Sequence, residues 1–355
     1  MTGATWSCRN WSGTVAAVGI AFLAVLLTAC EGKLSGPSPT VGDVTPRLAC
    51  GEQVVTTVRI DGTGMSPMGI DVAKDKAHLA LPRVTLLRVQ DLDGTAVKDA
   101  LPVEIPNDPY HPEAARVRWT DQATMEFLVY PELGLTPGLY EVTVTNPNGH
   151  QVTLPEAVVV VPRPTLSAIV PDLACTGQGA RAFKVQGKGF LHMKGTGAMP
   201  RVTVSSATSG TVTVDVETLT DCVALPGRAD AETCRTGTIT LPQGAPDPTL
   251  VNALAGPDKV LVLITNPDPG ACHSEDAVTM AIVPPPSLAA VEPDLACVAQ
   301  GPRVLTLTGS NFVEVAGDTP DVAFGAATFP ADAATACVAI AGTLLDAKDC
   351  TTLTV

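Results

Sequence analysis

The chain has 355 residues, 22 basic and 36 acidic side chains, and a formal net charge of −14. Its length allows two or three domains, each large enough to bury a core. The acidic surplus repels phosphate groups and anionic lipid headgroups, which argues against nucleic-acid binding and against membrane docking through basic patches. Thirty-one Gly and thirty-one Pro argue against long helices, because both residues destabilise a helix interior.

The first 29 residues are predicted to be an export signal. Arg9 supplies a weakly basic start, and no acidic residue precedes Glu31. The apolar run at residues 15–27 has thirteen residues, too few for a relaxed membrane span but suited to the core of a signal peptide. The mean hydropathy of +0.26 therefore does not indicate a membrane-embedded chain, because its one long continuous apolar stretch lies in this segment.

The apolar run ends at Leu27-Thr28-Ala29-Cys30, which resembles the lipobox of bacterial lipoproteins. In that motif, small residues precede a cysteine whose thiol receives a diacylglycerol before the signal is removed. The resemblance implies a lipid on Cys30, a linker over residues 30–38, and anchoring to a bacterial membrane through several acyl chains. Glu31 is not the Asp that retains some lipoproteins at the inner membrane, so we expect the outer membrane or the cell surface. An ordinary secretory signal cut beside a cysteine is the alternative.

A long repeat organises the rest of the chain. A Pro-aliphatic-Pro segment followed by Leu-Ala-Cys occurs three times, and its copies end at Cys50, Cys175 and Cys297. A glycine stands twelve residues after each of these cysteines. The copies begin 125 and 122 residues apart, which is a repeat of whole domains. The predicted units are residues 39–163, 164–285 and 286–355.

Within each unit the pattern is that of antiparallel strands and turns. Hydrophobic residues alternate with polar ones, mainly Thr, at residues 202–204, 212–216 and 236–241, as in strands with one buried face. Residues 140–149 and 260–270 each combine a β-rich stretch with Asn-Pro and Gly, the pattern of a hairpin strand and its turn. Many short strands and no helical stretch predict an all-β fold of tandem antiparallel β-sandwiches.

These motifs, in this order, resemble the IPT/TIG family of immunoglobulin-like domains. The resemblance rests on the opening Pro-x-Leu-x-x-Ile-x-Pro strand, the second strand with its Gly-Phe or Asn-Phe ending, and the closing Thr-Asn-Pro hairpin. It covers the first two units nearly end to end and the first half of the third. It implies immunoglobulin-like sandwiches that act in recognition or as spacers, and it implies no catalysis. The units are longer than is usual for the family, with extra residues in the middle, such as residues 86–108.

The third unit is predicted to be incomplete at its C-terminus. Its sequence reaches Val355 within the stretch that aligns with residues 236–241 of the second unit, so it lacks the Thr-Asn-Pro hairpin and the last strands. A sandwich without these strands would have open edges and an uncovered core. We therefore expect either a fragment of a longer reading frame or a terminal unit that is only partly formed.

Two short disulfides are predicted from the ten cysteines. Cys8 lies in the signal and Cys30 is the predicted lipid site, which leaves eight cysteines in an oxidising, exported setting. Two near-identical segments begin with a cysteine and are followed by a second cysteine 12 or 13 residues later. Closing such a short loop stabilises by about 3 kcal/mol on the chain-entropy model. The predicted pairs are Cys222–Cys234 and Cys337–Cys350.

Two schemes remain for the other cysteines. Cys175 pairs with Cys272 by elimination in the first scheme. In the second, Cys50 reaches Cys272 across the boundary of the first two units, which would explain why the first unit has no equivalent of Cys272. Cys297 is left without an assigned partner. No close cysteine pair has zinc-ligand spacing, so no metal site is expected.

No catalytic or cofactor site is expected either. The sequence has no Gly-x-Ser-x-Gly nucleophile motif, phosphate-binding loop or dinucleotide fingerprint. Asp91-Leu92-Asp93-Gly94 holds only a fragment of a calcium-loop pattern and is predicted to be a hairpin turn. Trp119 is expected to pack into a core, and residues 107–113 are expected to form a loop. Five scattered histidines are predicted to lie in loops or on the surface: His78, His111, His150, His192 and His273.

Together these features predict a non-enzymatic, membrane-anchored bacterial lipoprotein whose immunoglobulin-like repeats serve in adhesion or as a scaffold or spacer. The expected partners are the membrane, through the lipid on Cys30, and an unidentified protein or glycan. One alternative is a carbohydrate-binding surface protein, for which aromatic side chains are few, at 4% of the chain. The other is the non-catalytic front of a larger cell-surface enzyme.

Overall fold

The computed structural model describes residues 35–70, 78–177, 179–206, 210–242, 258–295 and 301–355. The predicted signal peptide, Cys30 and Cys297 lie outside this part of the chain. Ser35–Val355 form one compact unit. In the described residues the only helices are two 3-10 turns, Pro112–Ala114 and Pro131–Leu133, and no helix there is long and apolar enough to cross a membrane.

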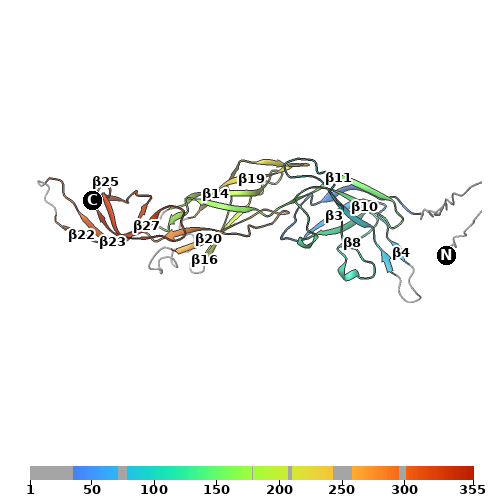
Figure 1. Cartoon of the computed structure of the whole chain (residues 1–355), viewed down its shortest axis with the longest axis horizontal. Helices are drawn as coiled ribbons and strands as arrows, with labels where there is room; N and C mark the ends of the chain where they lie inside the picture. The colour runs from blue at the N-terminus through green and yellow to red at the C-terminus, as the bar shows by residue number, and fades with distance from the viewer. Residues whose placement is uncertain (1–34, 71–77, 178, 207–209, 243–257, 296–300) are drawn as a thin grey trace, which may run out of the picture. The chain divides into compact units, whose positions relative to one another are not determined.

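The first sandwich consists of two sheets (Figure 1). One sheet has the order β1-β3-β9-β8, with β1 (Thr40–Thr45), β3 (Thr56–Thr63), β9 (Thr124–Val129) and β8 (Val117–Trp119). The other has the order β2-β11-β10-β6-β7, with β2 (Leu48–Cys50), β11 (Gln151–Val161), β10 (Gly138–Thr145), β6 (Arg83–Gln90) and β7 (Val103–Glu104). A separate small hairpin pairs β4 (Met68–Ile70) with β5 (His78–Ala80).

The second sandwich repeats this arrangement. Its first sheet has the order β12-β14-β19-β17, with β12 (Thr165–Val170), β14 (Arg181–Met193), β19 (Arg228–Leu241) and β17 (Thr218–Thr220); β18 (Val223–Leu225) also pairs with β19. Its second sheet has the order β13-β21-β20-β15-β16, with β13 (Leu173–Cys175), β21 (Val278–Val283), β20 (Asp258–Thr265), β15 (Arg201–Ser206) and β16 (Gly210–Asp215). The long strands β14 and β19 run side by side in Figure 1.

The strand order of both sandwiches is immunoglobulin-like. Reading the strands as A to G, one sheet has the order A-B-E-D and the other A′-G-F-C-C′, where the first strand of the unit is split between the sheets. The short strand A′ pairs in parallel with the last strand, as β2 with β11 and β13 with β21. Near the start of strand F, the Tyr140 hydroxyl donates to the Thr136 carbonyl at 2.6 Å, the tyrosine corner of such domains. The predicted all-β immunoglobulin-like fold is confirmed.

A third group of strands repeats part of this arrangement. Its sheet has the order β22-β23-β27-β26, with β22 (Ser287–Glu292), β23 (Thr306–Val315), β27 (Ala347–Thr354) and β26 (Ala333–Ala339). The strands β24 (Asp321–Phe324) and β25 (Ala327–Pro330) correspond to C and C′ and pair with each other. In the described part of the third group, the other edge of β24 has no partner strand.

The cores lie between the paired sheets. Residues of β9 alternate between buried and half-buried, and its buried side chains are Met125, Phe127 and Val129. This alternation follows from the strand period of two, which points successive side chains to opposite faces. The second core is likewise built mainly from aliphatic side chains, together with Phe183 and Phe190. Aromatic side chains make up only 4% of the chain, so aliphatic side chains supply most of each core.

The repeated glycine lets strands A and B of each unit approach closely. A Cβ added at Gly187 would lie 1.9 Å from the Thr165 carbonyl oxygen, and a Cβ at Gly62 would lie 1.9 Å from that of Thr40. At Gly309 in the third group the same distance is 2.0 Å. The pairing of strands A and B shifts register at this point in all three copies. Only glycine fits, which explains why its spacing from the Leu-Ala-Cys motif recurs.

The asparagine of each Thr-Asn-Pro motif joins the two sheets of its sandwich. Asn266, 3% exposed, donates to the Gly189 carbonyl at 2.9 Å and accepts from the Leu191 amide at 2.9 Å. Asn146 donates in the same way to the Gly64 carbonyl at 2.7 Å. The sequence predicted only a turn at these residues. The structure adds that they satisfy backbone groups that would otherwise be buried without a partner.

Candidate functional site

The first and second sandwiches meet at a disulfide. Cys50, at the end of β2, is bonded to Cys272, on the turn between β20 and β21, with their Cα atoms 5.9 Å apart. Both cysteines are fully buried. The first scheme, a Cys175–Cys272 bond, is therefore wrong. The sulfur of Cys272 is bonded to Cys50, and Cys175 keeps a free thiol. The second scheme, a Cys50–Cys272 bond across the boundary of the first two units, is confirmed.

An apolar cluster surrounds this bond. Gly270 lies so close to it that an added Cβ would be 2.7 Å from Leu48 and 2.8 Å from Leu191. Side chains of both sandwiches contribute to the cluster: Leu48, Leu139, Val159, Val161, Leu191, Met193, Leu225 and Ala231. Fully burying one such side chain contributes about 1.5 to 3 kcal/mol. We call the disulfide and this cluster the first junction.

Polar contacts line the rim of the first junction. The Arg163 Nε lies 3.1 Å from a Glu52 carboxylate oxygen, and the other side of the guanidinium pairs with Glu275. Gln53 accepts a hydrogen bond from the His273 amide at 2.8 Å. Arg163 is about a third exposed, so each ion pair is worth at most about 1 kcal/mol. Their effect is mainly to fix orientation, because contacts from both sandwiches converge on this rim.

A second junction lies between the second sandwich and the third group of strands. Its apolar cluster comprises Ala281, Val283, Ile340 and Ala347, with Leu173, Cys175, Val313 and Val315 packed against it. The Thr279 hydroxyl donates to the Gly342 carbonyl at 3.1 Å, and the Asp172 carboxylate accepts from the Leu344 amide. Among the described residues no disulfide crosses this junction.

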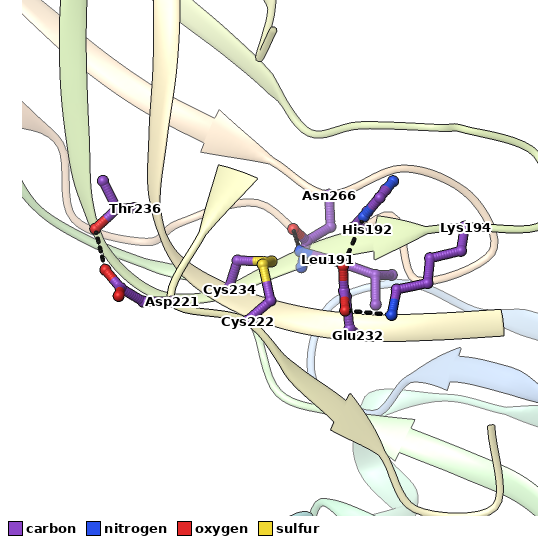
Figure 2. Close-up of a disulfide and its surroundings, with 9 residues drawn as sticks. All are labelled: Leu191, His192, Lys194, Asp221, Cys222, Glu232, Cys234, Thr236 and Asn266. Carbon is purple, nitrogen blue, oxygen red and sulfur yellow. Dashed lines mark hydrogen bonds and ion pairs between the residues drawn. A yellow bond between two sulfur atoms is a disulfide. The ribbon is translucent and has the colours of Figure 1, made fainter. Parts of the chain in front are cut away.

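The Cys222–Cys234 disulfide joins the residue just before β18 to β19, the strand with which β18 pairs (Figure 2). In Figure 2, His192 and Lys194 both point to the Glu232 carboxylate, at 2.9 and 2.5 Å. The Lys194 ammonium and, to a smaller extent, the His192 ring lower the pKa of Glu232 from its ordinary value. The carboxylate therefore stays ionised in its half-buried position.

The Cys337–Cys350 disulfide has the same position in the third group. There Lys348 lies 3.0 Å from Glu314, and this hydrogen-bonded pair raises the pKa of Lys348. Comparison of the registers shows that Glu314 occupies the place of His192, and Lys348 that of Glu232. The cationic and acidic members of the pair are thus exchanged between strands. Both short disulfides that the near-copy segments predicted are present in the structure.

Two groups of side chains have donor atoms close enough for a metal ion. They are Cys222 with Glu232 and Cys234, and Glu314 with Cys337 and Cys350. In each group the two sulfurs are bonded to each other, so neither group offers the thiolates that a zinc ion needs. These clusters are stabilising features rather than metal sites in the disulfide form.

The other motifs of interest lie where their roles are structural. The Asp91 to Gly94 segment forms a turn, in which the Gly94 amide donates to the Asp91 carbonyl at 3.0 Å. The Trp119 indole is half-buried and donates to the Met65 carbonyl at 2.8 Å. His111 pairs with Asp108 in an exposed loop, which lowers the pKa of Asp108 and raises that of His111. Sequence reasoning missed the His192 contact with Glu232, since its partner lies forty residues further along the chain.

No protein-family model and no curated protein match the chain in sequence. Similar solved structures include Dpr11 IG1 bound to DIP-gamma IG+IG2, at 12% identity over 70% of this chain and 98% of that chain, with a TM-score of 0.22. The titin domains z1z2 in complex with telethonin share 14% identity over 71% and 97%, with a TM-score of 0.19. A marsupial T cell receptor shares 10% over 89% and 92%, with a TM-score of 0.28. The assignment of the fold rests on the strand order.

Proposed function

We propose that the chain is an exported bacterial lipoprotein whose immunoglobulin-like sandwiches form a non-catalytic scaffold or spacer at a membrane surface. The anchor is the lipid on Cys30, and the membrane is the outer membrane or the cell surface. The lipobox-like segment at Leu27-Thr28-Ala29-Cys30 and the acid-rich, strand-rich chain behind it support this proposal. We also propose that the chain consists of three units, which resemble domains of the IPT/TIG family. Their bounds are residues 39–163, 164–285 and 286–355.

The first junction is the observation that carries the scaffold role. Domains joined by a flexible linker are expected to move relative to each other unless a large apolar interface holds them. Here a disulfide between Cys50 and Cys272 and a buried apolar cluster act together, and Arg163 contacts residues on both sides. Such a junction keeps two successive domains at one orientation. A spacer that presents a partner at a set distance needs this property.

The anchor is tested by fractionation. The full chain is expressed in a bacterial host that lipidates exported proteins, and membrane and soluble fractions are compared for wild type and Cys30→Ser. We expect wild type in the membrane fraction and the variant outside it, because the variant has no thiol for the thioether. Cys8→Ser is the matched control and should fractionate like wild type. Unchanged fractionation of Cys30→Ser would refute lipidation at this residue.

The scaffold role is tested by a distance measurement across the first junction. Spin labels are placed through non-natural amino acids at the exposed residues Gln151 and Glu217, which lie in different sandwiches. We expect a narrow distance distribution in the native protein and a broad one in the Cys50→Ser/Cys272→Ser variant. A distribution that is equally broad in both proteins would show that the sandwiches move independently, and would contradict a scaffold of fixed geometry.

A further inference from the structure

The two junctions are built from equivalent residues. Cys50 pairs with Val161 between β2 and β11, and Cys175 pairs with Val283 between β13 and β21 in the same parallel register. On the other side, Leu191 and Val313 each follow a phenylalanine that pairs with a disulfide-bonded cysteine. The walls of the second junction therefore repeat those of the first.

At the first junction, the space between these walls is filled by the turn at Gly270 and Cys272. An added Cβ at Gly270 would lie 2.7 Å from Leu48, 2.8 Å from Leu191 and 3.4 Å from Val161. Cys272 extends from this turn to Cys50. The turn is thus in contact with both sandwiches and closes the junction covalently.

At the second junction, a cavity of about 350 Å³ lies between the equivalent walls. We call this cavity the socket. Cys175, Val283 and Val313 line it, in the places of Cys50, Val161 and Leu191, and Phe312 and Pro285 complete its apolar surface. Pro285 stands where the first junction has Arg163. The socket has the walls of the first junction, but among the described residues no cysteine-bearing turn lies between them.

The exposure of strand A′ reflects this difference. All three residues of β2 are buried. The Gly270 turn lies against Leu48 and carries Cys272, the partner of Cys50, whereas Ala49 packs into the core of the first sandwich. In β13, Ala174 is buried but Leu173 and Cys175 are only half-buried. The Cys175 thiol is free and stands at the wall of the socket, where a disulfide partner would approach.

One edge of β24 is unpaired among the described residues, and this edge favours a hairpin of strands F and G as the occupant of the socket. In the complete sandwiches, strand C pairs with strand F, as β6 with β10 and β15 with β20. In the described part of the third group, β24 pairs with β25 alone. A hairpin of strands F and G would pair with β24 through backbone hydrogen bonds, and its turn would then lie at the junction. An open strand edge is a template for adding such a strand.

We propose that the socket is a covalent docking site for a β-hairpin of the F–G type whose turn carries a cysteine, equivalent to β20, Gly270, Cys272 and β21. The hairpin adds strand F to β24 and places its turn in the socket. Its cysteine then forms a disulfide with Cys175. The proposal does not depend on lipidation of Cys30 or on the scaffold function, since it rests on the residues of the second junction alone.

The bond forms by thiol–disulfide exchange. The Cys175 thiolate attacks the cysteine sulfur of a hairpin whose cysteine is held as a mixed disulfide with a small thiol. The new sulfur–sulfur bond forms as the old one breaks, and the small thiol leaves as a thiolate and takes up a proton. One disulfide is exchanged for another, so no further oxidant is required.

The test uses the full chain and a synthetic peptide of residues 258–283, with its cysteine as the 2-thiopyridyl mixed disulfide. We expect one peptide to attach, at Cys175, with release of one 2-thiopyridone. Non-covalent docking raises the local concentration of the two sulfurs, so attachment should be at least about tenfold faster than that of a scrambled peptide. A Gly270→Val peptide should react at the scrambled rate, because its side chain clashes with the socket walls.

Variants of the chain separate docking from simple thiol reactivity. Val313→Trp fills the socket and should reduce the rate to that of the scrambled peptide, while iodoacetamide still modifies Cys175 at the wild-type rate. Val338→Trp is the matched control, since Val338 is 72% exposed and lies outside the socket; it should react like wild type. Equal rates for the native and scrambled peptides would overturn the proposal. So would attachment at Cys297 instead of Cys175, or a native Cys175–Cys297 disulfide.

Discussion

The two junctions of this protein are lined by equivalent apolar residues and differ in how they are closed. In the first, Leu48, Val161 and Leu191 meet under a turn whose Cys272 is bonded to Cys50. In the second, Leu173, Val283 and Val313 meet beside a cavity and a free Cys175. The comparison shows that strand pairing and aliphatic packing set the walls of a junction, whereas the hairpin turn decides whether it is sealed.

Removing the first disulfide makes the first junction resemble the second, and this change has the largest expected effect. The bond joins cysteines 222 residues apart, and closing such a loop stabilises by up to about 5 kcal/mol on the chain-entropy model. Cys50→Ser/Cys272→Ser should therefore lower the free energy of unfolding by several kcal/mol in urea denaturation. Cys175→Ser removes a free thiol and serves as the control, with little expected change. Equal stability of the double variant and wild type would show that the apolar cluster alone closes the junction.

The two junctions have equivalent walls only if strand B keeps the same register in the second sandwich and in the third group. The repeated glycine allows this register. Gly187→Ala would place a Cβ 1.9 Å from the Thr165 carbonyl oxygen. Because backbone must move to relieve this overlap, we expect a loss of at least about 3 kcal/mol in thermal or urea unfolding. At Gly179 an added Cβ meets no atom within 4 Å, so Gly179→Ala is the matched control. Similar stability of the two variants would contradict the close approach.

Asn266 of the second Thr-Asn-Pro motif supports Leu191, a wall residue of the first junction. Among the described residues, no Thr-Asn-Pro motif supports the second junction in this way. Asn266→Ala would leave the Gly189 carbonyl and the Leu191 amide without their partner. Since Leu191 is a wall of the first junction, the variant should lose about 2 kcal/mol and show faster hydrogen exchange at the Leu191 amide. Gln151, which is exposed, supplies the control variant Gln151→Ala. Unchanged exchange at Leu191 would exclude this role for Asn266.

The smallest expected effect concerns the charge pair beside each short disulfide. The folded-state pKa of Glu232 is lowered below its ordinary value of 4.5 by Lys194 and His192. Its stabilisation is therefore fully present above the unfolded pKa and is lost as the pH falls through the folded pKa. Glu232→Gln should cost about 1 kcal/mol at pH 7 and nothing in strong acid, in urea unfolding at several pH values. Glu217→Gln, at an exposed carboxylate, should show no such difference, and a cost that persists in acid would point to packing instead of charge.

Much of the fold was predictable because it depends on local pattern. Alternation of aliphatic residues and Thr at residues 236–241 indicates a strand, since only a period of two buries one face, and β19 includes this stretch. The near-copy segments at Cys222 and Cys337 predicted the short disulfides, because the two cysteines of each pair lie in or directly beside strands that are neighbours along the chain and in the sheet.

The covalent closure of the first junction was harder to predict, because it depends on which ends of the sandwiches face each other. Cys272 could reach either Cys50 or Cys175 by sequence, since both end a Leu-Ala-Cys motif. The roles of Asn266 and Glu232 were also hidden, because their partners lie on other strands. Long-range placement of this kind follows from packing and leaves no periodic signal along the chain.

The closure of the first junction is tested most directly by peptide mapping of the native protein under non-reducing conditions, with free thiols alkylated first. We expect a linked peptide that contains Cys50 and Cys272, and an alkylated peptide that contains Cys175. A linked peptide that contains Cys175 and Cys272 would contradict this closure, because the first junction would then be open and the socket would have no free thiol.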